Sequence, residues 1–262
     1  LHRDKIERLK SGDPNLFNDI RRVKIGDSSL DPSNWVKICG AYLDAAFGGS
    51  IYTKLALGER AEGLLASKHI LTLDISVKQA DKNNKLPEFL SKLGASFYPR
   101  PNAQNNEKGW EWPISKLIEQ GTSEQRVALL CWIGDYWDVL KSVVGKSSAH
   151  LDPVKKMVIT IGENQIEVSQ LVQDTPNNRE TFGDTVGYLP KSVNSEFASV
   201  IGCPLQPDAS SLLNGLRSLS GLGITSTVKD RAEKFYRHLL TLPEIEPNIV
   251  KLAFTQSELT IA

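Results

Sequence analysis

SEQRVALLCWIGDYWDVLKSVVG, residues 123–145, is the stretch that decides the fold class. Its apolar residues recur at i, i+3, i+4 and i+7, and its first half is apolar almost all round, as in a helix covered on several sides. Thr122 and Gln125 have the spacing of a capping box, and Gly145 can end a helix. We therefore expect a central buried helix over about 123–144. Several charged residues interrupt this stretch and exclude a membrane span: Arg126, Asp135, Asp138 and Lys141.

Length and charge narrow the class of protein. A chain of 262 residues can form one large domain or two lobes, with a substantial core. The 31 basic and 31 acidic side chains balance, so the total charge does not indicate a polyanionic partner, although the clustering of charge matters more than the total. Cys39, Cys131 and Cys203 lie far apart without a CxxC pair, which favours a reducing compartment. We expect the protein in the cytoplasm or in a virion.

Several other segments carry helical periodicity or signals for the start of a helix. The clearest amphipathic pattern follows Asp31 and Pro32 and predicts a helix over 35–47. A second helix is expected after Ser50, through about Ser67. Shorter helices are expected after Asp13, after Pro87, and over 113–120, 192–201, 209–219 and 227–240.

Strands and loops account for the remaining segments. Apolar and polar residues alternate around 71–77, which predicts a strand over about 70–78, and again over about 156–168, which predicts a small hairpin. Residues 98–112 are rich in Pro, Asn and Gly and predict a long loop. Residues 146–153 are expected to be a connector, and the polar residues 173–184 a flexible surface loop. The fold class predicted from these patterns is mainly α-helical, with two helical lobes around a central buried helix and a few short β-strands.

The predicted elements suggest four parts of the chain. Residues 1–12 would be an N-terminal arm, 13–145 an N-terminal helical lobe, 146–242 a C-terminal helical lobe with the hairpin, and 243–262 a C-terminal tail. The arm has few apolar residues and the tail is set off by Pro243 and Pro247, so both ends are better suited to docking on a neighbour than to folding alone. We therefore predict self-association through the terminal arms.

No motif in the chain identifies a reaction. Gly145, Lys146 and Ser147 match the end of a phosphate-binding loop, but position 140 is Leu where that loop needs Gly. The four histidines have no spacing typical of a metal site. We expect no enzymatic activity, no cofactor and no metal; an active site built from distant residues is the alternative.

Basic residues supply the more informative pattern. Lys234, Arg237 and His238 stand at i, i+3 and i+4 in the predicted helix 227–240, with Arg231 one turn earlier. Such a helix face can contact phosphates, and a solvated face is the alternative. Aromatic residues beside cations, as at Tyr98 and Tyr236, can stack unpaired bases or pack in the core. The full set of candidate nucleic-acid-binding residues is Arg21, Arg22, Lys24, Arg100, Lys155, Lys156, Arg231, Lys234, Arg237 and His238.

In size and layout, though in no motif, the chain resembles the helical nucleocapsid proteins of RNA viruses. Those proteins polymerise by exchange of terminal arms and hold RNA in a basic cleft between two helical lobes. The resemblance implies a non-enzymatic, self-assembling protein of nucleocapsid or coat type that binds single-stranded RNA and has no membrane partner. The alternative is a helical protein–protein interaction or adaptor domain, in which the same arms dock on a different protein.

Overall fold

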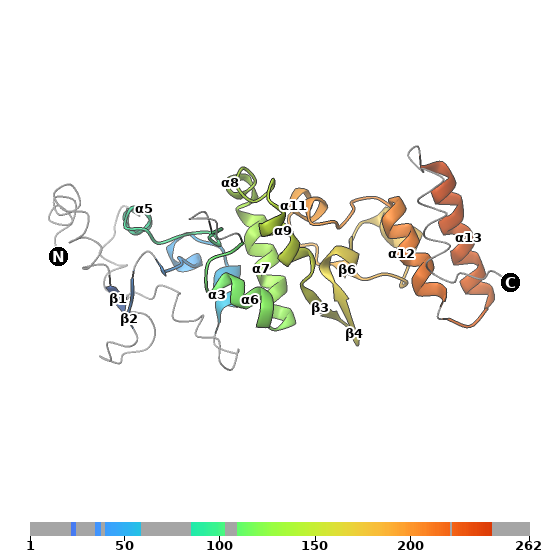
Figure 1. Ribbon diagram of the computed structural model, residues 1–262, viewed down its shortest axis with the longest axis horizontal. Helices are drawn as coiled ribbons and strands as arrows, with labels where there is room; N and C mark the ends of the chain where they lie inside the picture. Colours follow the sequence, from blue (N-terminus) through green and yellow to red (C-terminus); the bar gives the residue numbers. More distant parts are fainter. Residues whose placement is uncertain are drawn as a thin grey trace. The chain divides into compact units, whose positions relative to one another are not determined.

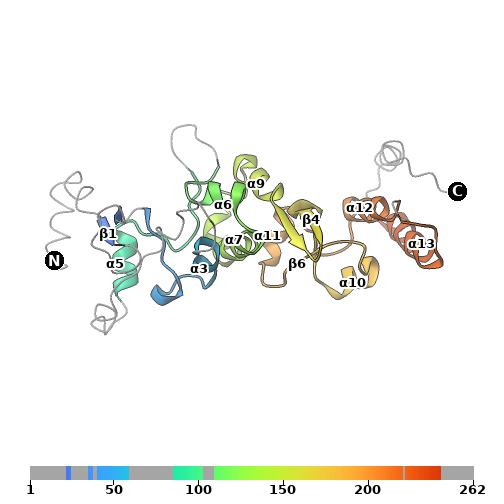
Figure 2. The same cartoon turned by 90° about the horizontal axis from the view of Figure 1, so that it is seen from below.

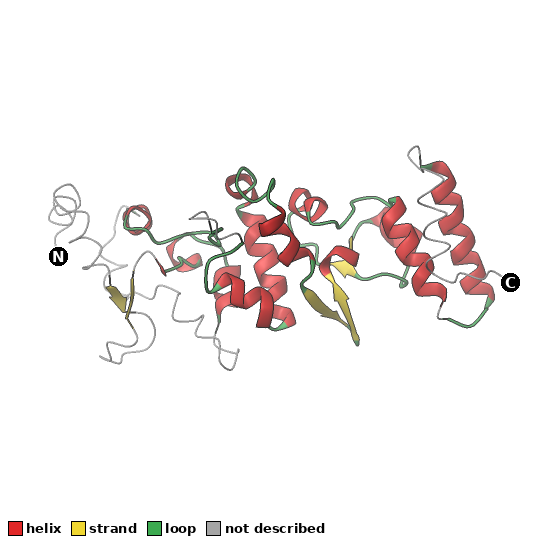
Figure 3. Cartoon of the chain, viewed as in Figure 1, coloured by secondary structure: helices red, strands yellow, loops and turns green. Residues whose placement is uncertain are grey.

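The computed structural model describes residues 40–58, 85–102, 109–220 and 222–242, together with the backbone of two short strands at 22–24 and 35–37. The chain divides into two compact units, Leu1–Lys146 and Ser147–Ala262. Both units are mainly helical with a few short strands, as the sequence predicts (Figures 1 and 3). None of the helices in the described residues combines the length and the hydrophobicity that a membrane crossing needs.

Unit 1 is built on helix α7, Ser123–Asp135. The predicted capping box is present: Thr122 Oγ1 accepts a hydrogen bond from the backbone N–H of Gln125 at 3.3 Å, and Gln125 Oε1 accepts one from the N–H of Thr122 at 3.0 Å. The helix packs against α3, Tyr52–Leu57, and contacts α6, Ile114–Gln120 (Figure 2). Its fully buried apolar side chains include Leu129, Leu130, Trp132 and Ile133.

The helix predicted over about 123–144 is buried as expected, but it is in two pieces rather than one. Tyr136 ends α7 with φ −113° and ψ 20°, outside the helical region, and its ring contacts that of Tyr98 at a centroid distance of 6.0 Å. Helix α8, Trp137–Leu140, and hydrogen-bonded turns up to Gly145 follow. Beyond the break Trp137, Leu140 and Val144 are still buried while Val139 and Val143 are exposed, so periodicity alone does not reveal the interruption.

The helix predicted over 35–47 is wrong. Strand β2, Trp35–Lys37, pairs antiparallel with β1, Arg22–Lys24. Leu43 N–H donates to the carbonyl of Ser96 at 2.8 Å, and Ser96 N–H donates to the carbonyl of Ala41 at 3.0 Å. Among the described residues of this range, Ala45–Phe47 form a 3₁₀ turn, η3. The bridge between Tyr42 and Ser96 holds residues 41–43 in place, and the side chains of Ala41, Tyr42 and Leu43 are fully buried.

The rest of unit 1 packs beside that segment. Helix α5, Leu86–Lys92, begins near Pro87 as predicted and forms an apolar cluster with residues around Leu43. A bridge between Pro101 and Trp110 closes the base of the predicted loop 98–112. Five predicted features lie wholly or largely outside the described residues: the arm 1–12, the helix after Asp13, the far part of the helix after Ser50, the strand over 70–78, and the C-terminal tail 243–262.

Unit 2 begins with a helix where the sequence predicts a connector. Helix α9, Ser148–Lys155, buries Leu151 and Val154, and two apolar residues are too few to show as a period. The predicted hairpin is confirmed: β3, Val158–Ile161, pairs antiparallel with β4, Asn164–Glu167. Gly162 opens the two-residue turn at φ +62°, a conformation that favours glycine. A 3₁₀ turn, η5 at Val168–Gln170, follows.

The flexible loop predicted over 173–184 is also wrong. Strand β5, Val172–Gln173, pairs in parallel with β6, Tyr188–Leu189, and helix α10, Pro176–Phe182, lies between them in sequence. Thr175 caps α10, because its Oγ1 accepts from the N–H of Asn178 at 3.1 Å. The side chains of Asn178 and Phe182 are fully buried, so the segment belongs to the core of unit 2.

Three helices complete unit 2 near their predicted positions: α11, Ser195–Val200; α12, Ala209–Ser220; and α13, Ser226–Thr241. Helices α12 and α13 lie side by side (Figure 1). Gly215 allows their close approach, since a Cβ there would lie 2.9 Å from the ring of Phe235. Helix α13 therefore packs closely against α12, and it also contacts α10.

Candidate functional site

Helix α13 carries four of the candidate residues: Arg231, Lys234, Arg237 and His238. Arg231 and His238 stand one turn before and one turn after buried Phe235 and are half-buried, Lys234 is also half-buried, and Arg237 is exposed. The first three of these four, together with Thr227, Asp230 and Glu233, line a shallow hollow of about 370 Å³. Three of these six lining residues are cationic and two are anionic, so the hollow is basic but partly compensated.

Two of these cations also cap helix α10. Arg231 Nη1 donates to the carbonyl of Thr181 at 3.1 Å, and Lys234 Nζ donates to the carbonyl of Glu180 at 2.8 Å. These carbonyls belong to the last turn of α10, where helix carbonyls lack partners within the helix and the helix dipole favours cations. His238 Nε2 lies 3.4 Å from Thr181 Oγ1. Arg231 and Lys234 are therefore held in position by the end of α10.

Arg237 is the most exposed of the group. Its side chain is 76% exposed, and Nη2 contacts Glu233 Oε1 at 2.5 Å, one turn away on α13. An exposed ion pair of this kind contributes about 0 to 1 kcal/mol, so exchanging Glu233 for another anion costs little. Arg237 is thus the group on α13 best placed to change partners.

The other candidate residues lie elsewhere. Arg100 Nη2 donates to the carbonyls of Ala41 at 3.0 Å and Gly94 at 2.8 Å, and its side chain is only 16% exposed, so its bonds are directed into unit 1. Lys155 and Lys156 end helix α9 in unit 2. Arg22 and Lys24 belong to β1, of which only the backbone is described, and Arg21 lies outside the described residues.

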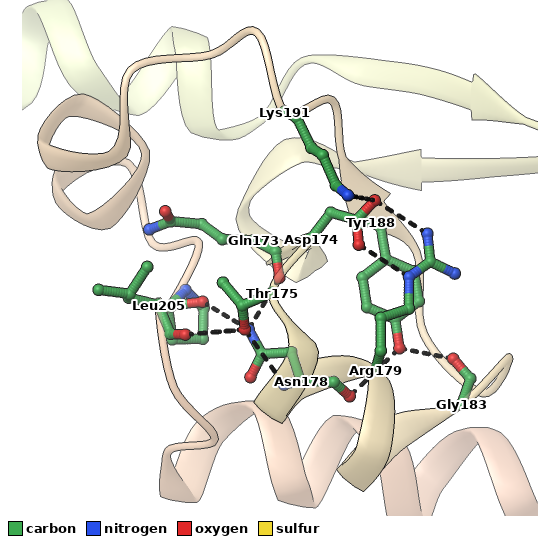
Figure 4. Close-up of polar contacts among 10 residues, drawn as sticks. Gln173, Asp174, Thr175, Asn178, Arg179, Gly183, Tyr188, Lys191 and Leu205 are labelled. Atoms are coloured by element: carbon green, nitrogen blue, oxygen red, sulfur yellow. Dashed lines mark hydrogen bonds and ion pairs between the residues drawn. The ribbon is translucent and has the colours of Figure 1, made fainter.

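A second cationic cluster, beside α10, is absent from the sequence prediction. The guanidinium carbon of Arg179 lies 3.8 Å from the centre of the Tyr188 ring, while Nε and Nη2 donate to the two carboxylate oxygens of Asp174 at 2.8 and 3.1 Å (Figure 4). Lys191 Nζ lies 3.9 Å from the same carboxylate. The Thr175–Pro176 pair, a cap followed by a first-turn proline, is the signal that could have located α10 and hence Arg179.

The charges of this cluster are fixed at neutral pH. The hydrogen bond from Arg179 holds the pKa of Asp174 below its ordinary value, and the same bond raises the pKa of Arg179. Burial raises the pKa of Tyr188. The carboxylate is therefore ionised, the guanidinium is charged and the phenol is neutral.

Two buried amide side chains, those of Asn178 and Gln173, form hydrogen bonds next to this cluster. Asn178 Nδ2 donates to the carbonyls of Gln173 at 2.9 Å and Pro204 at 3.1 Å. Gln173 Nε2 donates to the carbonyl of Cys203 at 2.9 Å, and its Oε1 accepts from Ser195 Oγ at 2.7 Å. These bonds hold β5, the start of α10 and the segment after α11 in one arrangement.

The described residues offer little for catalysis or metal binding. In these parts of the chain no three His, Cys, Asp or Glu side chains gather closely enough to hold a metal ion. Cys131 and Cys203 are buried thiols and form no disulfide. Burial raises the pKa of Cys203 to about 12, so its thiol is protonated at neutral pH and is a poor nucleophile.

Comparison of the chain with protein families, with curated proteins and with solved structures gives no match.

Proposed function

We propose that the chain is a non-enzymatic, self-assembling protein that binds single-stranded RNA, as nucleocapsid and coat proteins do. The observation that carries the proposal is the row of cations on α13, Arg231, Lys234 and Arg237, which line one hollow. Guanidinium and ammonium groups in a row can contact successive phosphates, and their binding releases condensed counterions. The same contacts are independent of base sequence, as packaging of a long RNA requires.

The bonds to α10 favour this role. A guanidinium has five N–H donors and an ammonium has three, so bonds to carbonyls leave Arg231 and Lys234 with donors for a phosphate. Because the carbonyls already hold both side chains in place, binding costs less side-chain entropy than it would for free surface residues. A phosphate entering the hollow would replace Glu233 as the partner of Arg237.

Exposed apolar side chains support the self-assembly part of the proposal. Ile51 and Leu55 lie one turn apart at the start of α3, and both are more than half exposed. Leu222 and Ile224, in the turn before α13, are similarly exposed. Exposed apolar groups of this kind are typical of surfaces that associate. Light scattering of nuclease-treated protein tests this part: a mass that rises with concentration supports assembly, and a single-chain mass throughout contradicts it.

Fluorescence anisotropy with a labelled single-stranded RNA across a salt series tests the RNA-binding part. The double variant Lys234→Ala, Arg237→Ala should bind unrelated sequences more weakly, and its slope of log K against log salt should fall by about 1.4, or about 0.7 for each lost phosphate contact. Lys229→Ala is the matched control, because Lys229 is exposed on α13 but does not line the hollow. A full slope in the double variant would exclude these residues as phosphate contacts.

A second candidate function rests on the same exposed apolar residues. In a protein–protein interaction or adaptor domain, Ile51, Leu55 and their counterparts before α13 would contact a different protein. Absence of RNA binding by the nuclease-treated wild type at low salt would contradict the RNA proposal and favour this alternative.

A further inference from the structure

The stacked pair of Arg179 and Tyr188 has the geometry of a site for a planar ligand. A cation within about 6 Å of an aromatic ring centre is attracted by the ring, and the distance here is 3.8 Å. The two hydrogen bonds to Asp174 hold the guanidinium by one edge and fix its rotation. The guanidinium plane is therefore set by a ring on one face and a carboxylate on one edge (Figure 4).

The opposite face of the guanidinium is open. The Arg179 side chain is 49% exposed although the Tyr188 ring covers one face and Asp174 one edge, so the exposed part includes the outer face. Lys191 beside it is 74% exposed. A flat, charged surface with an exposed ammonium next to it is thus available to solvent.

Hydrogen bonds fix the Tyr188 ring to helix α10. Tyr188 Oη donates to the carbonyl of Gly183 at 2.5 Å and lies 3.3 Å from the carbonyl of Asn178, which ties the ring to α10. Asn178 is itself fully buried, and Arg179 follows it in the same helix. Ring, guanidinium and helix therefore keep one geometry, and a stacked ligand would meet a preformed surface.

We propose that the outer face of Arg179 stacks on one unpaired base of the bound RNA, with Lys191 contacting the adjacent phosphate. Guanidinium planes and aromatic rings are common platforms for unpaired bases, because every base has a π-face. The inference rests on the proposed function. It adds a base contact to the phosphate contacts of α13, and the two are linked through α10, which carries Arg179 and whose last carbonyls hold Arg231 and Lys234.

Two strands of equal length separate base contacts from phosphate contacts: a labelled oligouridylate and the same strand with abasic residues. Wild-type protein should bind the intact strand about tenfold more tightly, within the range measured for stacking of one base. Arg179→Lys keeps the charge but loses the plane, so it should lose most of this preference while its affinity for the abasic strand and its salt slope stay unchanged. Arg217→Lys is the control, because Arg217 is an exposed arginine of α12 whose Nη1 bonds to Asn214.

The outcomes are distinct. An equal loss of affinity for both strands in Arg179→Lys, or an unchanged preference, would overturn the stacking platform and leave the proposed function standing. Failure of the wild type to bind either strand would overturn both. Should Arg179→Lys fail to fold by circular dichroism, ultraviolet crosslinking of the wild type to RNA containing 4-thiouridine decides the question. Adducts on peptides with Arg179 or Tyr188 support the platform, and adducts confined to other segments overturn it.

Discussion

The two units differ in the side chains that are buried around α7 and around α10. In unit 1, α7 buries a run of apolar side chains, and Trp132 lies fully buried with its ring edge-on to Tyr42 at 5.1 Å. In unit 2, Val172, Phe182 and Phe235 belong to an apolar cluster, and beside it the buried side chains of Gln173 and Asn178 bond to backbone carbonyls. The comparison shows that a polar, loop-like sequence can form a core when side-chain amides take over the backbone partners that a longer helix or sheet would supply.

The largest loss of stability is expected when the buried ring of Trp132 is removed from unit 1. Trp132→Ala removes a buried ring and the hydrogen bond from its Nε1 to the carbonyl of Phe97 at 2.9 Å, so the free energy of unfolding should fall by about 3 to 5 kcal/mol. Val139→Ala, at an exposed site beyond the break in the helix, is the control. Urea unfolding followed by the remaining tryptophans measures unit 1, because all five tryptophans lie before residue 147. A loss below about 1 kcal/mol would show that α7 is not the centre of unit 1.

A smaller loss of stability is expected when the buried amide of Asn178 is removed. Asn178→Ala removes the donor to two backbone carbonyls and leaves a buried gap, which should cost about 2 to 3 kcal/mol. Asn177→Ala is the matched control, because the neighbouring Asn177 is exposed on the same helix. Unfolding followed by far-ultraviolet circular dichroism should separate the two variants. Equal stability of the variants would mean that the amide bonds do not organise unit 2.

The pH dependence of unit 1 offers a further test of its apolar centre. Burial raises the pKa of Tyr42 to about 12, against an ordinary value near 10. The folded protein therefore holds this proton longer than the unfolded chain, so its stabilising contribution is complete below pH 10 and is lost as pH rises toward 12. At pH 11 the loss should be about 1.4 kcal/mol relative to neutral pH.

Tyr42→Phe provides the control for that titration. No group among the described residues meets full hydrogen-bond geometry with the Tyr42 hydroxyl, although the backbone N–H of Arg100 lies near enough to oppose the effect of burial on its pKa. The variant should therefore stay within about 1 kcal/mol of the wild type near pH 7 and lack this part of the alkaline loss. Urea unfolding of both proteins at pH 7 and pH 11 gives the comparison. Equal alkaline losses in the two proteins would show that Tyr42 ionises as freely in the folded state as in the unfolded chain.

The elements that the sequence predicts well are helices with a clear apolar pattern or a clear cap. Helices α12 and α13 bury apolar stripes with the period of a helix, α7 is apolar and buried almost all round, and α7 and α13 also carry side-chain caps at their first turns. The helix over 35–47 is wrong because pairing of Ala41 to Leu43 with the segment around Ser96 overrides a pattern that also fits a helix. The loop over 173–184 is wrong because the segment is held by amide bonds and by the single buried ring of Phe182, which together leave no period in the sequence.

The sequence also predicts only part of the candidate site. The cations of α13 are visible in the sequence because i, i+3 and i+4 positions share a helix face. Their bonds to α10 are not visible, since Glu180 and Thr181 lie some 50 residues earlier in the chain. The stack of Arg179 on Tyr188 joins a helix to a strand beyond it, and only the folded structure brings the two together.

Hydrogen exchange with and without RNA tests the central claim most directly, because it compares both units in one experiment. With saturating single-stranded RNA at low salt, exchange should slow in peptides that cover α10, β6 and α13, where the cations and the stacked pair lie. Peptides from α6 and α7 serve as the internal reference and should be unchanged. Slower exchange confined to α6 and α7, or no change in any peptide, would contradict RNA binding by unit 2.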